Sequence, residues 1–150
     1  MKITEETVTK AIICWLEDAG WEIICFDFPQ SGTGVMLHPN IKTRASKNKG
    51  STIPDVVAIK NRVVVFFENK DRFVLEDFVK IQGLRENDNY SIAIARLLTD
   101  YDYSRIAYGV GLPHSSRTEN RVKNELNKVD FVVFYVDKKV DVFFENVATF

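Results

Sequence analysis

The stretch Ile53–Lys70, with the sequence IPDVVAIKNRVVVFFENK, decides how this chain is expected to fold. Two runs rich in β-branched and aromatic residues, Asp55–Ile59 and Val63–Phe67, flank the three residues KNR. The central Asn61 tolerates the left-handed backbone that tight hairpin turns require. The two runs are therefore predicted to pair as an antiparallel hairpin.

Charged residues cluster at one end of this predicted hairpin. Asp55 begins the first run, Glu68 ends the second, and Lys70 follows two residues later. Residues equidistant from a hairpin turn face each other, which brings Asp55 and Glu68 together. Strand side chains alternate with period two, so Glu68 and Lys70 project to the same side. Two carboxylates and an ammonium group are costly to bring together unless a divalent cation or a polyanion binds there.

The rest of the chain predicts helices interleaved with strands. Helical spacing and capping residues indicate helices over Thr4–Gly20, Arg72–Asn87 and Ser115–Asn127. The apolar run Tyr90–Leu98 is interpreted as a strand covered on both faces. The remaining predicted strands are Trp21–Phe28, Ile106–Leu112, Phe131–Asp137 and Val140–Glu145, the last two joined by Lys138-Lys139. The order predicts one α/β (α+β) domain over residues 1–150, with a central mixed β-sheet flanked by helices.

Composition favours a globular protein of the cytoplasm. The chain is 45% hydrophobic and 27% charged, and no apolar run is long enough to cross a bilayer. The N-terminal sequence MKITEETVTK carries acids and lacks the apolar core of a signal peptide. Cys14 and Cys25 lie in apolar segments without metal-ligand spacing, so both are predicted to be buried free thiols.

Basic residues are concentrated in two segments, although the net charge is only −1. A loop without acids, from Pro39 to Pro54, leads directly into Asp55, and a second segment lies in the predicted helix at 115–127. Both are candidate DNA contacts, because lysine and arginine bind phosphates and arginine also reads guanine. An ordinary solvated surface is the alternative in each case. The candidate residues are Lys42, Arg44, Lys47, Lys49, Arg117, Arg121 and Lys123.

The chemistry of the charged cluster indicates Mg²⁺, which proteins hold through one or two carboxylates together with water and phosphate oxygens. Zinc is disfavoured, since the sequence has no Cys/His cluster. A nucleotide cofactor is not expected either, because the segment QSGTG at 30–34 lacks a Walker lysine and a following helix. The competing structural interpretation is that Asp55 belongs to a turn and that Glu68 and Lys70 form a strand-end ion pair.

The sequence resembles the PD-(D/E)xK nuclease superfamily, which includes type II restriction endonucleases and archaeal Holliday-junction resolvases. The resemblance rests on Pro54-Asp55 and on Glu68-Asn69-Lys70. It also covers the order helix, strand, hairpin, helix, strand from Thr4 to Leu98. A restriction-endonuclease-like core is the fold that this resemblance implies.

The resemblance also implies roles for individual residues. Asp55 and Glu68 would bind the metal, Mg²⁺ with Mn²⁺ as a substitute, and the Asn69 carbonyl would be a third ligand. Lys70 would be the catalytic lysine. An additional acidic residue from the first helix would match Glu5, with Glu6 in reserve. Glu5 is unusual on its own account, because it extends the buried stripe of its helix, where a carboxylate needs a partner.

Together these observations predict a Mg²⁺-dependent DNA endonuclease of the restriction type, acting on duplex DNA. A Holliday-junction resolvase or another structure-specific nuclease is the first alternative. A non-catalytic DNA-binding subunit on the same fold, or a hydrolase of another phosphodiester such as RNA, are further alternatives. Cutting both strands of a duplex favours a homodimer, for which the aromatic stretch Phe131–Phe150 is a candidate surface.

Overall fold

A computed structural model describes residues 2–28, 34–40 and 51–150 of the chain. In these ranges six strands form one sheet in the order β1-β2-β3-β4-β5-β6. The strands are β1 (Glu22–Phe26), β2 (Val56–Lys60), β3 (Val63–Asn69), β4 (Arg105–Pro113), β5 (Phe131–Val136) and β6 (Lys139–Glu145). The helices are α1 (Glu5–Asp18), α2 (Leu75–Glu86), α3 (Ser91–Leu97) and α4 (Ser116–Val122), with 3₁₀ turns at η1 (Asp88–Tyr90) and η2 (Leu126–Lys128).

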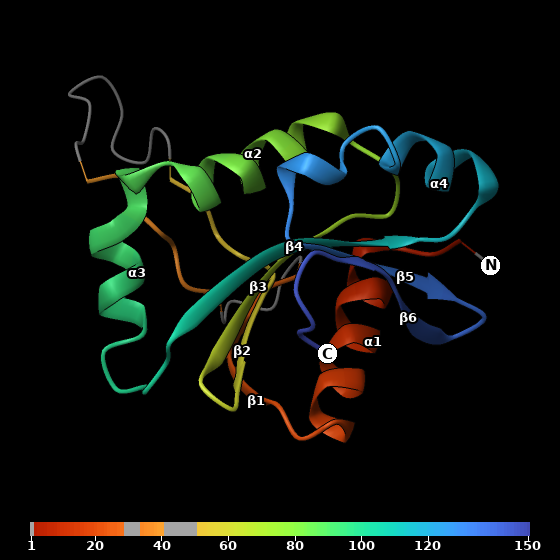
Figure 1. Cartoon of the computed structure of the whole chain (residues 1–150). Coiled ribbons are helices and arrows are strands. Elements are labelled where there is room, and N and C mark those ends of the chain that lie inside the picture. Colours follow the sequence, from red (N-terminus) through yellow and green to blue (C-terminus); the bar gives the residue numbers. More distant parts are fainter. Residues whose placement is uncertain (1, 29–33, 41–50) are drawn as a thin grey trace.

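The sheet is mixed, as predicted. Strands β1, β2 and β3 form an antiparallel meander, β3, β4 and β5 run parallel, and β6 returns antiparallel to β5. Helix α1 covers one face, while α2 and α4 lie together on the other (Figure 1). The prediction of an α/β fold with helices on both sides of a mixed sheet is therefore confirmed.

Strand β3 is the centre of this arrangement, since both of its faces are buried. Val64 and Phe66 pack toward α2, whereas Val65 and Phe67 pack toward α1. All four side chains are fully buried. A strand that is apolar on both faces has little freedom to shift its register, so the residues at its end are held firmly in place.

The hairpin between β2 and β3 has the predicted register. Asn61 and Arg62 have φ values of 50° and 66°, the left-handed pair that a two-residue type I′ turn requires. Val56 pairs with Phe67, so Asp55 stands opposite Glu68 at the end of the hairpin. The β5–β6 hairpin has the same type of turn at Asp137 and Lys138, with φ values of 49° and 65°. Its turn therefore lies one residue earlier than the predicted Lys138-Lys139.

The predicted strand at Tyr90–Leu98 is wrong, because this segment forms η1 and helix α3. Ile94 and Leu98, four residues apart, are buried, whereas Ile92 is 50% exposed. One stripe of the segment packs on the sheet, and alanine, leucine and arginine favour a helix there. Together with α2, this helix supplies the long connection that the parallel strands β3 and β4 need.

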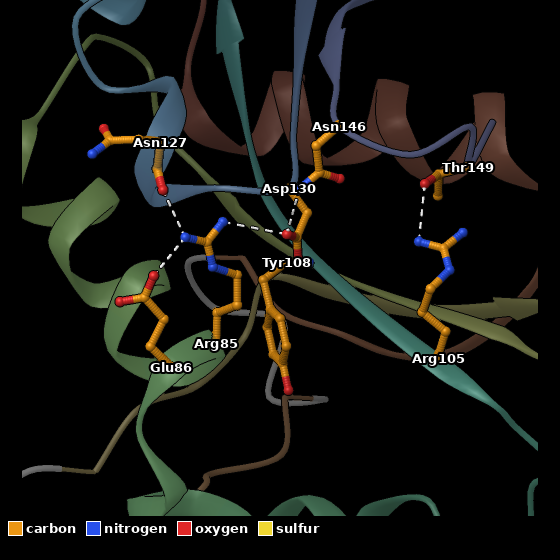
Figure 2. A network of polar contacts seen from close by, with 8 residues as sticks. All are labelled: Arg85, Glu86, Arg105, Tyr108, Asn127, Asp130, Asn146 and Thr149. Atoms are coloured by element: carbon orange, nitrogen blue, oxygen red, sulfur yellow. Dashed lines mark hydrogen bonds and ion pairs between the residues drawn. The ribbon is translucent and has the colours of Figure 1, made fainter.

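A network of hydrogen bonds and ion pairs connects α2 to the residues that flank β5 (Figure 2). Arg85 of α2 donates from Nη1 to Oδ1 of Asp130 at 3.3 Å and from Nη2 to the carbonyl of Asn127 at 2.6 Å. Asp130, which precedes β5, also accepts from the backbone N–H of Tyr108 and from Asn146 Nδ2, both at 2.9 Å. The network fixes the position of the helix whose first half lies beside Glu68.

The C-terminal aromatic stretch packs mainly inside the molecule. Phe150 lies 5.0 Å from both Trp15 and Phe131, measured between ring centroids. It also lies 5.6 Å from the ring of Trp21 and thereby closes the core under α1. Core packing therefore accounts for Phe131 and Phe150, and the homodimer predicted from this stretch stays a prediction.

Both cysteines are free, but only Cys25 is buried, since Cys14 lies on the exposed side of α1. Within the described ranges, no helix is long and apolar enough to cross a membrane. Residues 41–50, which include Lys42, Arg44, Lys47 and Lys49, lie outside the described residues, as do residues 30–33 of the QSGTG segment.

Candidate active site

Asp55 and Glu68 form a buried pair at the carboxyl end of β3. Their relative exposures are only 8% and 7%. The regular pairing of β2 with β3 ends at Val56 and Phe67, and the backbone N–H of Asp55 also donates to the carbonyl of Phe67, at 3.0 Å. Glu68 follows Phe66 by two residues and so points to the face that α2 covers, where its charge acts on Asp55.

Asn69 fastens this pair to the surrounding elements. Its backbone N–H donates to Oδ2 of Asp55 at 2.6 Å. Its side-chain Nδ2 donates to Oγ1 of Thr9, a fully buried residue of α1, at 3.1 Å. The next backbone N–H, that of Lys70, donates to the carbonyl of Gly111 in β4 at 3.1 Å. The side chain of Asn69 thus binds α1. The predicted metal ligand is the backbone carbonyl of Asn69, which this side-chain contact does not involve.

Burial is the main cause that raises the proton affinity of both carboxylates. Burial, followed by the charge of Glu68, raises the pKa of Asp55 from 3.8 to about 8, although the N–H of Asn69 opposes the shift. Burial also raises the pKa of Glu68, against the opposing effect of Lys80. Without a cation, the pair therefore retains a proton at neutral pH, and a bound cation would replace that proton.

Lys70 joins the pair to α1. Its Nζ lies 3.6 Å from Oε1 of Glu5, in the first turn of α1, and both side chains are about 30% exposed. Burial by itself lowers the pKa of Lys70, but the carboxylates around it, led by Asp77 and Glu5, raise it overall. Lys70 is therefore an ammonium ion at neutral pH. Of the two acids considered for this place, Glu5 is the one that contacts Lys70, since Glu6 pairs with the exposed Lys10 at 3.7 Å.

Two further charged residues, both on α2, reach this region and were missed in the sequence. Lys80 Nζ lies 3.1 Å from Oε1 of Glu68. Asp77 interacts electrostatically with Lys70, Lys80 and Glu68, and burial raises its pKa. A signal was present, because Asp77 lies beside Ile81 and Leu84 on the apolar face of its helix. Like Glu5, an acid on a buried stripe needs a partner.

The donor set suits a hard cation. Asp55, Glu68, Glu5 and Asp77 contribute carboxylates against the ammonium groups of Lys70 and Lys80, which leaves an excess of negative charge. No three His, Cys, Asp or Glu side chains in the described ranges lie close enough together to share one metal ion. Mg²⁺ does not need three, since one or two carboxylates with water and substrate oxygens complete its octahedron. Asp55 and Glu68 therefore fit Mg²⁺, with Glu5 and Asp77 farther out.

Arg117, Arg121 and Lys123 lie beside the same edge of the sheet. Helix α4 follows the carboxyl end of β4, which runs parallel to β3. All three side chains are exposed. The guanidinium of Arg121 lies 5.7 Å from the ring centre of Phe73, three residues after Lys70, while Lys123 pairs with Glu119 at 3.7 Å. Arg121 thus lies close to the segment that follows Lys70, and Arg117 lies one helical turn before it on α4.

No family model, curated protein or solved structure matches this chain.

Proposed function

We propose that this chain is a Mg²⁺-dependent DNA endonuclease on a restriction-endonuclease-like core, and that it cleaves duplex DNA. The buried pair of Asp55 and Glu68 carries the proposal. Two carboxylates facing each other at 8% and 7% exposure destabilise the fold when both are ionised. Such a cost is expected at a functional site, where a cation offsets it.

The residues around the pair have complementary roles in this proposal. Asp55 and Glu68 would hold Mg²⁺, and a bound Mg²⁺ would supply an activated water and stabilise charge at the phosphate. Lys70, held as an ammonium ion by the carboxylates near it, stabilises the anionic transition state instead of removing a proton. Glu5 orients Lys70 through their 3.6 Å ion pair.

Phosphodiester chemistry is favoured by the surroundings of the site. Arg117 and Arg121 provide exposed positive charge beside an otherwise acidic cluster, as a polyanionic substrate requires. The basic residues Lys42, Arg44, Lys47 and Lys49 precede Asp55 in the sequence and remain candidates for the same role. Cleavage of both strands by this single site per chain would call for a homodimer.

Cleavage of supercoiled plasmid by the purified protein tests the proposal. We expect nicked and linear DNA with Mg²⁺ or Mn²⁺ and none with a chelator. Asp55→Asn and Lys70→Met should lower the rate by about 100-fold or more. Lys10→Met serves as the control and should keep the wild-type rate, because it removes a lysine whose ion pair with Glu6 is exposed. Absence of cleavage of plasmid, linear duplex, single-stranded and four-way-junction DNA with either metal would refute the proposal.

The same panel separates the alternatives. Discrete plasmid fragments indicate a restriction-type enzyme, whereas preference for four-way junctions regardless of sequence indicates a resolvase. Binding of DNA without cleavage, unchanged by Glu68→Ala, indicates a non-catalytic subunit. Cleavage of RNA in preference to DNA would identify a ribonuclease built on the same chemistry.

A further inference from the structure

Lys80 occupies an oxygen of Glu68 that a metal ion would need. Its Nζ lies 3.1 Å from Oε1 of Glu68, and this is both an ion pair and a hydrogen bond. The glutamate side chain is 8% exposed and that of Lys80 is 36% exposed. The ammonium group therefore reaches the buried carboxylate from the solvent side, by which a hydrated cation would also arrive.

A divalent cation and this ammonium group would exclude each other. A carboxylate that coordinates Mg²⁺ does so through its oxygen lone pairs, and Lys80 now uses one of those of Oε1. Like charges a few ångströms apart also repel, more strongly at a partly buried position than in water. A cation bound by Glu68 would thus repel the ammonium group of Lys80 and weaken its contact with Oε1.

The displaced ammonium group has an alternative partner close by. Asp77 precedes Lys80 by three residues on α2, a spacing that brings side chains together on a helix surface. Its Oδ2 is buried and accepts no hydrogen bond from the described residues. Lys80 can therefore leave Glu68 and remain paired.

From these contacts we propose that the ammonium group of Lys80 takes the place of a metal ion at Glu68, and that metal binding displaces it toward Asp77. Competition with Lys80 then sets the concentration of metal at which the site is filled. The inference rests on the proposed Mg²⁺ site at Asp55 and Glu68. It adds a residue, outside the sequence motif, that competes with the metal.

Calorimetric titration of the full chain with Mg²⁺ alone tests this competition. The titration is done at about pH 9, above the pKa of about 8 of Asp55, so that protons compete little with the metal. We expect Lys80→Met to bind Mg²⁺ about tenfold more tightly than wild type, since a hydrogen bond between charged groups is lost from the competing state. Lys80→Arg should bind like wild type because it keeps the cation. Lys10→Met, which removes an exposed lysine–glutamate pair, should also bind like wild type.

The outcomes separate the two proposals. Equal or weaker binding of Mg²⁺ by folded Lys80→Met, with wild type binding normally, overturns the role of Lys80 alone. Absence of Mg²⁺ binding by both proteins, or binding that Asp55→Asn leaves unchanged, overturns the proposed metal site itself. Melting curves establish which variants are folded.

A crystal structure of the wild-type chain with Mn²⁺ provides a second test that does not depend on any variant. We expect the metal to be bound by Asp55 and Glu68, with Lys80 Nζ more than about 4 Å from Glu68. A metal bound there with Lys80 still on Oε1 would refute the displacement.

Discussion

The backbone N–H of Asn69 donates to Oδ2 of Asp55 across the end of the hairpin, at 2.6 Å. This bond holds the aspartate in place even when its charge is removed, because an asparagine oxygen accepts the same bond. Asp55→Asn is therefore a substitution that removes a buried charge with little change in shape.

Stability without metal is predicted to fall as the pH rises from about 4 to about 8. The pKa of Asp55 is 3.8 when unperturbed and about 8 in the fold, so in this window the native chain holds a proton that the unfolded chain has released. The contribution is fully present below the unfolded pKa and is lost as the pH passes the folded one. The loss should be on the order of 5 kcal/mol in the free energy of unfolding, because each tenfold change in proton affinity contributes about 1.4 kcal/mol. Urea denaturation at several pH values, with chelator present, measures it.

Asp55→Asn provides the matched comparison for that measurement. This variant should make the unfolding free energy depend less on pH, and it should make the metal-free protein more stable than wild type near pH 8. A wild-type stability that stays constant or increases from pH 5 to pH 8 would contradict the predicted shift. A variant whose stability falls as steeply as that of wild type would assign the shift to another group.

Glu5→Gln is predicted to slow cleavage while leaving stability and DNA affinity nearly unchanged. The pair of Glu5 and Lys70 is about 30% exposed and 3.6 Å long, so it contributes at most about 1 kcal/mol to folding. Without this ion pair, the ammonium group of Lys70 is no longer held where it would stabilise the transition state. We therefore expect a roughly tenfold lower kcat with unchanged KM. Glu6→Gln is the control, because Glu6 pairs with Lys10 at the surface. A rise in KM without a fall in kcat would place Glu5 in DNA binding instead.

Gly111→Ala is predicted to disturb the support of Asn69. A Cβ at Gly111, the partner of Asn69 in β4, would lie 2.5 Å from Asn69 Oδ1 and would also collide with Ile12. Both neighbours are buried, so neither can move without disturbing α1. We expect a loss of about 1–3 kcal/mol in unfolding free energy, measured by denaturation. Gly83→Ala is expected to increase the unfolding free energy instead. Gly83 lies within α2 with open space around it, and alanine favours helices. Similar effects of both substitutions would refute this account.

The hairpin and its charged end could be predicted from the sequence because their determinants are local. Turn residues, alternation and equal spacing from the turn suffice to pair Val56 with Phe67, and this pairing brings Asp55 close to Glu68. Glu5 was identified because a carboxylate there extends the buried stripe of its helix, which is also a local signal.

The contribution of α2 could not be predicted in the same way. That Lys80 lies on Glu68 depends on how a helix packs across the sheet, and this packing is set by contacts distant in sequence, such as those of Arg85 with Asp130. The error at Tyr90–Leu98 has a related cause. An apolar run fits a doubly buried strand or a helix equally well until the neighbouring elements are known.

Arg117 and Arg121 are predicted to contact DNA phosphates. Their joint replacement by alanine should weaken binding of duplex DNA and lower the slope of log affinity against log salt by about 2, since each phosphate contact contributes about 0.9. The control Arg62→Gln removes an exposed arginine from the β2–β3 turn, at the opposite end of the hairpin from Asp55 and Glu68. Fluorescence anisotropy over a range of salt concentrations, with Ca²⁺ in place of Mg²⁺, measures both slopes. An unchanged slope in the double variant would remove α4 from the DNA-binding surface and leave the segment Lys42–Lys49 as the remaining candidate.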